Sequence, residues 1–123
     1  MSYDRIGVIG AMDSELAALI AALTQPAQET VQGLVFHTGR LGAREVVLVR
    51  CGIGKVSAAR CTQVLIDRFA PGAVINTGIA GGLASGLAVG DIVVADGLVQ
   101  HDFDAAPIGF VRVCVCMLSL IHI

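Results

Sequence analysis

Runs of apolar residues alternate along this chain with glycine-rich turns and with segments in which apolar positions recur every three or four residues. Continuous apolar runs lie within residues 6–10, 45–51 and 73–76, and such runs are typical of strands buried on both faces of a sheet. Segments of helical period follow the first two runs. The pattern therefore predicts a repeated succession of strand, turn and helix, which is the arrangement of an α/β fold.

The first helix is expected directly after residues 6–10. Asp13 or Ser14 is of the type that caps a helix, Glu15 then falls in the first turn, and Pro26 ends the helical pattern. The apolar positions with helical spacing are Leu16, Leu19, Ile20 and Leu23. This region is predicted to form a strand–loop–helix unit with a carboxylate near the start of its helix.

Two strands and a second helix are expected next. Residues 31–37 and 45–51 have the composition of strands, and residues 40–44 between them suit a turn, which predicts a hairpin. The second helix is expected over residues 56–69 and ends at the Pro-Gly pair that follows it. Its apolar positions are Val56, Ala59, Val64, Leu65 and Phe69.

The run at residues 73–76 is followed closely by three glycines, Gly78, Gly81 and Gly82. Glycine lacks a Cβ and tolerates positive φ, so backbone N–H groups in such a stretch can approach a ligand closely. Open α/β sheets also bind ligands beyond the carboxyl ends of their strands. Residues 74–82 are therefore predicted to be a strand that ends in the floor of a ligand site.

The last part of the chain is expected to add further strands. Residues 91–95 have a strand pattern, which extended chain at residues 98–100 continues. Residues 111–123 contain no acidic residue and no turn signal, so as a strand they would associate with other chains unless they were covered. We expect one domain over residues 1–110 and an anomalous apolar tail after it.

Composition narrows the class of protein. Of the 123 residues, 55% are hydrophobic and 15% are charged, which excludes a disordered chain. A net charge of −2 without a basic cluster does not indicate binding to a nucleic acid or to a membrane surface. Since the sequence has neither a transmembrane-length apolar span nor a signal-peptide pattern, a cytoplasmic location is expected. The cysteines lack the paired spacing of a zinc site and are expected to be reduced packing residues: Cys51, Cys61, Cys114 and Cys116.

One glycine motif invites a nucleotide interpretation but lacks the required spacing. Residues 52–55, GIGK, fail as a G-x-x-x-x-G-K-S/T phosphate loop because Val49 and Val56 occupy two of the required positions. They also fail as a G-x-G-x-x-G fingerprint because Ser57 occupies the last glycine position. ATP and NAD are disfavoured, and no cofactor is expected.

The remaining polar candidates are ambiguous from position alone. Residues 101–104, HDFD, bring three potential ligands together, but no other His or Cys converges on them, so a polar loop and no metal is expected. His37 and His122 receive no role. Glu15 fits an ordinary carboxylate in the first turn of a helix, or a functional one, and Met12 fits core packing.

Four motifs lie in the order and at the intervals of one known family. They are residues 6–15, IGVIGAMDSE; residues 51–56, CGIGKV; residues 76–82, NTGIAGG; and residues 89–94, VGDIVV. Together they resemble the 5′-methylthioadenosine/S-adenosylhomocysteine nucleosidases, relatives of the nucleoside phosphorylases. The resemblance implies an α/β fold with a mixed, largely parallel sheet flanked by helices and incomplete at its C-terminal end. It makes residues 1–110 the N-terminal part of one domain and residues 111–123 foreign to the family.

The resemblance also implies a reaction, the hydrolysis of 5′-methylthioadenosine and S-adenosylhomocysteine to adenine and a thio-ribose, as in methionine salvage. Cleavage of an N-glycosidic bond needs a carboxylate to position water and an acid to protonate the leaving group. The family's water-side carboxylate corresponds to Glu15, and Ile79 stands where a serine is common. The positions that correspond to substrate-binding residues are Met12, Ile53, Ile79, Ala80, Gly81, Ala105, Ile108 and Phe110. The last three match a loop that the family donates across a homodimer interface.

The family's second half carries a glutamate that grips the ribose hydroxyls and an aspartate that acts as the acid at adenine. The 123 residues contain no counterpart of either group. We therefore expect no measurable nucleosidase activity from this chain alone. The alternatives are a purine nucleoside phosphorylase or a futalosine hydrolase of the same superfamily, or a non-functional fragment that self-associates.

Overall fold

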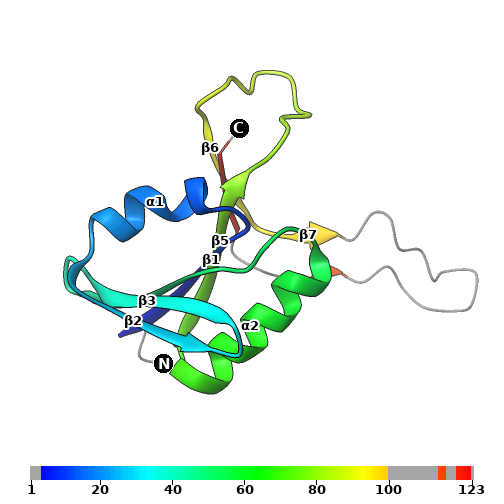
Figure 1. Ribbon diagram of the computed structural model, residues 1–123. Coiled ribbons are helices and arrows are strands. Elements are labelled where there is room, and N and C mark those ends of the chain that lie inside the picture. Colours follow the sequence, from blue (N-terminus) through cyan, green and yellow to red (C-terminus); the bar gives the residue numbers. More distant parts are fainter. Residues whose placement is uncertain (1–3, 100–113, 116–118, 123) are drawn as a thin grey trace, which may run out of the picture.

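The computed structural model describes residues 4–99, 114–115 and 119–122. The strands are β1 (Arg5–Gly10), β2 (Thr24–Val31), β3 (Leu34–Leu41), β4 (Arg44–Arg50), β5 (Ala73–Ile79), β6 (Ile92–Ala95), β7 (Leu98–Val99), β8 (Cys114–Val115) and β9 (Ser119–His122), and the helices are α1 (Asp13–Ala21) and α2 (Lys55–Phe69). Seven strands form a central sheet in the order β2-β3-β4-β1-β5-β9-β6, while β7 and β8 pair separately (Figure 1). The predicted α/β fold with a mixed sheet flanked by helices is confirmed.

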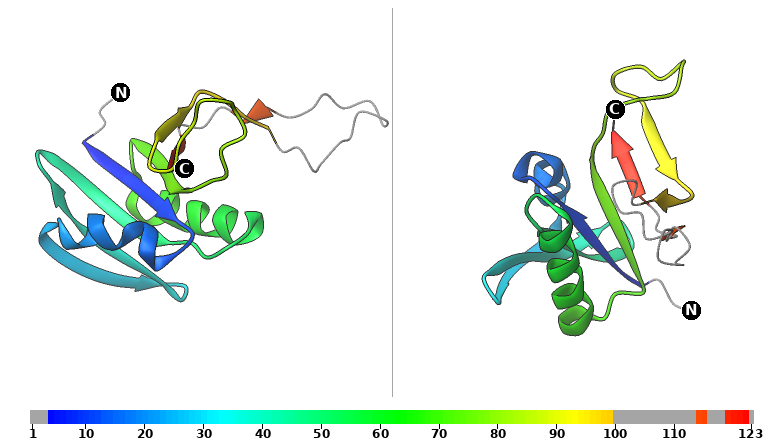
Figure 2. Two further views of the ribbon diagram at one scale, coloured as in Figure 1. Left: turned by 90° about the horizontal axis from the view of Figure 1, so that it is seen from above. Right: turned by 90° about the vertical axis from the view of Figure 1, so that its right-hand side faces the viewer.

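The centre of the sheet is parallel. β1 lies between β4 and β5 and runs parallel to both, and β9 runs parallel to β5 on its other side. The outer pairs β2–β3, β3–β4 and β6–β9 are antiparallel. Figure 2 shows β6 and β9 beyond β5, on the side away from α1 and α2. Because β1, β4 and β5 are parallel, their carboxyl ends meet at one edge of the sheet, where a ligand site is expected.

The two helices cover opposite faces of the sheet and complete two separate cores. Successive residues of a strand point to opposite faces, and in β4 Val46 and Leu48 belong to one buried cluster while Val47 and Val49 belong to the other. The first cluster includes Leu16 of α1. The second consists of Ile9, Leu34, Phe36, Val47, Val49, Cys51, Cys61, Val64, Leu65 and Phe69. Burial on both faces explains the continuous apolar runs in the sequence.

The first helix is shorter than predicted, and its cap is a different residue. Neither Asp13 nor Ser14 is the N-cap, which is Met12 with an extended backbone. The helix ends at Ala21, so Pro26 does not terminate it but lies inside β2. β2 is the edge strand of the sheet, and its pairing with β3 is irregular between Thr24 and Ala27. An edge position and an irregular register are the conditions under which a strand accommodates proline.

The single strand expected over residues 31–37 is wrong, because a turn divides it. Gln32 and Gly33 have φ values of 51° and 77°, and they connect β2 to β3 as a tight hairpin. Two positive φ values in a two-residue loop match the twist of the strands that they join. The one hairpin that was expected, with its turn within residues 40–44, is confirmed as the antiparallel pair β3–β4.

The second helix is confirmed in its extent, and of its five expected apolar positions Val64, Leu65 and Phe69 are buried. Val56 is 85% exposed and Ala59 is also exposed, whereas Cys61 is fully buried beside Val64 and Leu65. The helix ends at Phe69, and its C-cap residue Ala70 adopts the left-handed conformation with φ 44° and ψ 53°. The face that meets the sheet is therefore set by the last three turns of the helix.

β5 continues three residues beyond the predicted strand, through Gly78 to Ile79. The exposed segment 80–91 that follows has no regular strand or helix and extends beyond the end of β5 (Figure 1). The expected strand within residues 91–95 is confirmed as β6, and β7 covers the described part of residues 98–100. Within residues 111–123, β8 and β9 are described, and β9 lies between β5 and β6. No helix in the described ranges has the length and apolarity that a membrane span requires.

Candidate functional site

Glu15 lies in the first turn of α1, immediately beyond the carboxyl end of β1. The carboxylate reaches back to the start of the helix, where Oε2 accepts a hydrogen bond from the backbone N–H of Met12 at 2.9 Å. A glutamate three residues after the N-cap commonly makes this contact, and the positive end of the helix dipole favours its charge. The local sequence thus accounts for one of the two carboxylate oxygens.

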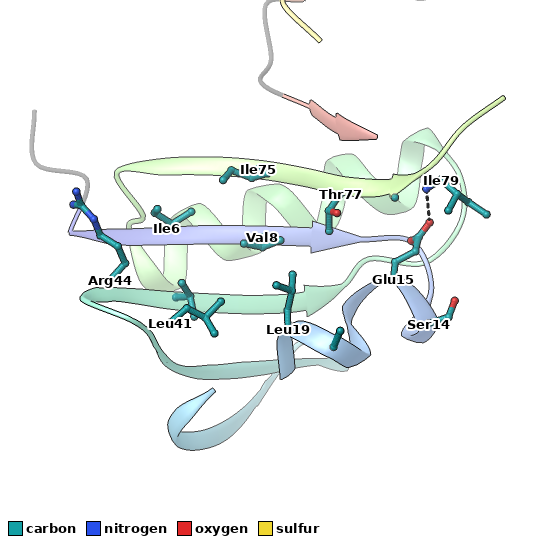
Figure 3. Close-up of a pocket in the computed structure, with 13 residues that line it drawn as sticks. Ile6, Val8, Ser14, Glu15, Leu19, Leu41, Arg44, Ile75, Thr77 and Ile79 are labelled. Atoms are coloured by element: carbon teal, nitrogen blue, oxygen red, sulfur yellow. Dashed lines mark hydrogen bonds between the residues drawn. The ribbon is translucent and has the colours of Figure 1, made fainter. Parts of the chain in front are cut away.

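The second oxygen of Glu15 joins α1 to β5. Oε1 accepts a hydrogen bond from the backbone N–H of Ile79 at 3.2 Å, across 64 positions of sequence. Figure 3 shows this bond at the end of β5. A capping role alone would leave this oxygen to solvent, so the carboxylate is held by two different elements of the fold.

A cavity of about 710 Å³ opens beside Glu15 on the α1 face of the sheet. It is lined by Ile6, Val8, Ser14, Glu15, Ala18, Leu19, Leu41, Arg44, Val46, Ile75, Thr77, Gly78 and Ile79. Glu15 and Ile79 lie at one end of it, while Leu41 and Arg44 lie at the other (Figure 3). The volume and the apolar walls suit a small organic molecule. Among the described lining residues, Glu15 is the only carboxylate.

The structure brings some of the expected site residues together and separates others. Met12 and Ile79 both donate backbone hydrogen bonds to Glu15, and Ile79 is 70% exposed at the mouth of the cavity. Ile53 is 79% exposed in the loop between β4 and α2 and does not line this cavity. The exposed Ala80 does not line it either. These residues lie beyond the carboxyl ends of β4 and β5, whereas the cavity extends along the sheet face.

Four further expected residues complete this comparison. Gly81 is exposed. The glycines after residue 76 were expected to allow positive φ values, but neither Gly78 nor Gly81 has one. Ala105, Ile108 and Phe110 lie outside the described residues, as does the HDFD stretch at residues 101–104. The proposed closing loop therefore stays a prediction.

Thr77 lines the cavity although the sequence did not single it out. Ile75, Thr77 and Ile79 are alternate residues of β5, and all three line the cavity. A strand presents alternate residues to one face, so this set could have been recognised if the predicted strand had extended to Ile79. Gly78, on the same strand, was noted only as part of a flexible floor.

The remaining polar candidates do not form a second site in the part of the chain that the structure describes. No group of three His, Cys, Asp or Glu side chains is placed to hold a metal within those residues. His37 lies on the β3 hairpin, where its Nδ1 is 3.1 Å from Nε2 of Gln28. Cys51 and Cys61 are free and buried, which confirms the packing role expected for these two.

A mixed α/β sheet with a carboxylate anchored at the carboxyl ends of its parallel strands, beside an apolar cavity, is the architecture of a small-molecule site in an α/β enzyme. The chain belongs to the phosphorylase superfamily, whose family model matches residues 5–117. This match runs beyond Phe110, the last residue of the domain expected from the sequence.

Individual relatives narrow the comparison. The chain is 48% identical over 106 residues to the 5′-methylthioadenosine/S-adenosylhomocysteine nucleosidase of Shewanella putrefaciens, a match that covers 86% of this chain and 46% of the relative. A nucleosidase of the same name from Colwellia psychrerythraea, solved in complex with adenine, matches with a TM-score of 0.85 and 45% identity over 89% of this chain and 45% of the other. A futalosine hydrolase mutant of Helicobacter pylori matches with a TM-score of 0.82 and 30% identity, over 92% of this chain and 53% of the other. The chain thus spans about half the length of the relatives that it matches.

Proposed function

We propose that this chain supplies the water-side half of the active site of a 5′-methylthioadenosine/S-adenosylhomocysteine nucleosidase. The observation that carries the proposal is the Glu15 carboxylate, held by the N–H groups of Met12 and Ile79 at the mouth of the cavity. The relatives that the chain matches at 45% and 48% identity bear this name. The four motifs quoted from the sequence support the same function.

The proposed chemistry is a displacement by water at the anomeric carbon of the ribose. Each carboxylate oxygen can accept two hydrogen bonds, and in Glu15 each accepts one from the backbone, so that lone pairs remain for a water molecule. The water forms a bond to C1′ and transfers a proton to Glu15, while the electron pair of the C1′–N9 bond leaves with adenine. Adenine takes a proton from a general acid, which the family resemblance assigns to a part of the protein outside this chain.

The other expected residues enter as parts of the same proposal. Ala80 and Gly81 would form the backbone floor of the site. Together with Met12, Ile53 and Ile79 they would border the ribose and its 5′ substituent. An isoleucine at position 79 keeps the backbone N–H that Glu15 accepts but provides no hydroxyl to the water. Methionine salvage, a homodimer whose partner contributes residues 105–110, and a cytoplasmic location complete the proposal.

Release of adenine tests this function. The purified 123-residue chain is expected to release no measurable adenine from 5′-methylthioadenosine, because the acid and the ribose clamp are needed together with Glu15. A chimera of residues 1–110 with the remaining part of the Shewanella putrefaciens relative is expected to release adenine. Glu15→Gln should lower the rate of the chimera by about 10²–10⁴-fold, the usual contribution of one acid–base group.

Asp13→Asn provides the matched control for Glu15→Gln. Asp13 lies in the same helical turn, but its carboxylate is exposed and pairs with Arg50 at 3.0 Å rather than facing the cavity. The Asp13→Asn chimera should keep its rate. Equal losses from both substitutions would contradict the role of Glu15. Adenine release by the 123-residue chain that Glu15→Gln abolishes would contradict the expectation that this chain alone is inactive.

Two enzymes of the same superfamily remain as alternatives, and the same chimera separates them. A phosphorylase would need phosphate in place of water, and a phosphate is bound best by basic side chains. Among the described lining residues the only basic side chain is that of Arg44, which lies at the far end of the cavity from Glu15 (Figure 3). A phosphate requirement for adenine release would favour that enzyme. Faster cleavage of futalosine than of 5′-methylthioadenosine would favour the hydrolase, which the Helicobacter pylori match makes the stronger alternative.

The third alternative is a fragment without function. Size-exclusion chromatography and thermal melting of the 123-residue chain separate a compact species from an aggregate. Aggregation together with an inactive chimera would favour this alternative over both enzymes.

A further inference from the structure

Gly78 is a glycine that its own backbone does not require. It lies inside β5, and its φ is not in the left-handed region. An alanine could adopt this backbone conformation without strain, and a glycine inside a strand weakens the strand. The reason for a glycine must therefore be sought in the space that a side chain would occupy.

The Glu15 carboxylate occupies that space. A Cβ added to Gly78 would lie 2.8 Å from Oε1 of Glu15, 3.3 Å from its Cδ and 3.7 Å from its Oε2. These are the three nearest atoms, and all belong to one side chain. Gly81, by contrast, has no atom within 4 Å of such a Cβ. Of these two glycines in the expected floor, only Gly78 has the carboxylate in the space that a Cβ would fill.

We propose that Gly78 is a positioning residue for Glu15, because its missing Cβ lets the carboxylate lie against β5 and accept the N–H of Ile79. The catalytic meaning of this placement rests on the proposed nucleosidase function. A methyl group at position 78 would displace Oε1 and break the bond to Ile79. The bond to Met12 would survive, because it forms within the first turn of α1. The carboxylate would then be held by one backbone N–H group, that of Met12, instead of two, and its position beside the water would be less well fixed.

A double-mutant cycle in the 123-residue chain tests this contact. We expect Gly78→Ala to lower the urea midpoint of unfolding, and we expect this loss to disappear or reverse in the Glu15→Ala background, where the space is vacant. An equal loss in both backgrounds would overturn the proposal. If Glu15→Ala prevents folding, Glu15→Asp replaces it, since its shorter side chain withdraws the carboxylate from Gly78.

Gly39→Ala is the matched control for the cycle. Gly39 also lies inside a strand, and a Cβ there would meet the backbone oxygen of Thr24 at 2.9 Å and the side chain of Leu23 at 3.2 Å. The crowding is similar but does not involve Glu15. Gly39→Ala should lower the midpoint equally with and without Glu15→Ala. Coupling of the same size at Gly39 and Gly78 would mean that Glu15→Ala weakens the whole fold, and would overturn the proposal.

The amide protons of Ile79 and Met12 give a readout that a merely structural role would not change. Glu15→Gln in the otherwise unsubstituted chain should shift both NMR resonances, because each N–H donates to the Glu15 carboxylate. In the Gly78→Ala background the shift at Ile79 should be lost and the shift at Met12 retained, whereas retention of both would contradict the proposal. If Gly78→Ala alone does not fold, recovery of a folded chain in the double variant supports the contact. An unfolded double variant beside a folded Glu15→Ala chain contradicts it.

These measurements use no substrate, so they test the role of Gly78 separately from the proposed function. Coupling between Gly78 and Glu15 without adenine release from the chimera would leave the positioning intact and remove the nucleosidase assignment. Adenine release without coupling would retain the function and remove the role of Gly78. If both hold, Gly78→Ala in the chimera should lower kcat with little change in KM, because the substitution misplaces the water rather than the nucleoside.

Discussion

The rings of Phe36 and Phe69 pack with their centroids 4.8 Å apart and their planes inclined by 44°. Phe36 comes from β3 and Phe69 from the last turn of α2, and Phe36 is fully buried. The pair therefore joins the hairpin side of the sheet to the helix that covers it. An aromatic pair in this arrangement adds to the free energy of simple burial.

Phe36→Ala should lower the free energy of unfolding by about 3–5 kcal/mol, because it leaves a cavity and removes the ring contact with Phe69. Urea denaturation followed by circular dichroism measures the loss. Val35→Ala is the matched control, since Val35 precedes Phe36 on β3 but is 43% exposed, and its loss should stay below about 1 kcal/mol. Similar losses from the two substitutions would mean that this core is not packed as described.

Ala70→Gly should stabilise the protein by about 0.5–1 kcal/mol, because Ala70 is left-handed at the end of α2 and glycine adopts that conformation without a steric cost. Ala22 ends α1 with a right-handed φ of −85°. Ala22→Gly is therefore expected to destabilise by a similar amount. Thermal and urea unfolding of both variants check the opposite signs, and a destabilised Ala70→Gly would refute the left-handed cap.

Arg5→Lys should destabilise the fold by about 1 kcal/mol, a modest value because the side chain is half exposed. The guanidinium of Arg5 donates to the backbone oxygen of Phe69 at 2.8 Å and to the Glu45 carboxylate at 3.0 Å. A lysine offers no planar fork to hold the helix end and the strand at once. Arg50 forms an exposed ion pair with Asp13. Arg50→Lys should therefore change the free energy of unfolding, measured by urea denaturation, by less than about 0.5 kcal/mol. Equal effects would argue against the anchoring of α2 by Arg5.

Stability should fall as the pH rises from 9 to 11. Burial raises the pKa of the Cys61 thiol from 9.0 to about 11, so the unfolded chain loses this proton first and the thiolate favours unfolding. The stabilisation that comes from the protonated Cys61 thiol is complete below pH 9, the pKa of the unfolded chain. It is lost as the pH rises toward the pKa of this thiol in the folded protein, by at most about 1.4 kcal/mol per pH unit. Urea midpoints across this range should fall less steeply in Cys61→Ala. An unchanged slope would assign the loss to other groups.

The elements that follow from local pattern were predicted well. β1 and β4 are each marked by a continuous apolar run, and α2 is marked by apolar residues with helical spacing. The turn of the β3–β4 hairpin is marked by Gly42, which has a positive φ. The predictions that failed include the cap and the end of the first helix, the undivided strand over residues 31–37 and the positive φ of Gly78 and Gly81. Pro26 ends a helix in an isolated sequence, but at the sheet edge it is accommodated in β2.

The candidate site was only partly visible in the sequence. Glu15 and Ile79 were identified from motifs, and the structure places them in direct contact. Thr77 was given no role, and Gly78 was noted only as part of the glycine floor, because the strand that carries them was expected to end at Asn76. Pairing with β9 extends β5 through Thr77 and Gly78 to Ile79, and β9 is not adjacent to β5 in sequence.

The sequence by itself determined the class of fold, the positions of the strands at the centre of the sheet and the presence of a carboxylate in the first turn of α1. Each of these follows from apolar periodicity or from hydrogen bonding within a few residues. Only the tertiary structure decided where the second oxygen of Glu15 goes, because its donor is 64 positions away on β5. It also decided why position 78 is a glycine, since the space beside a strand is defined by the elements packed against it.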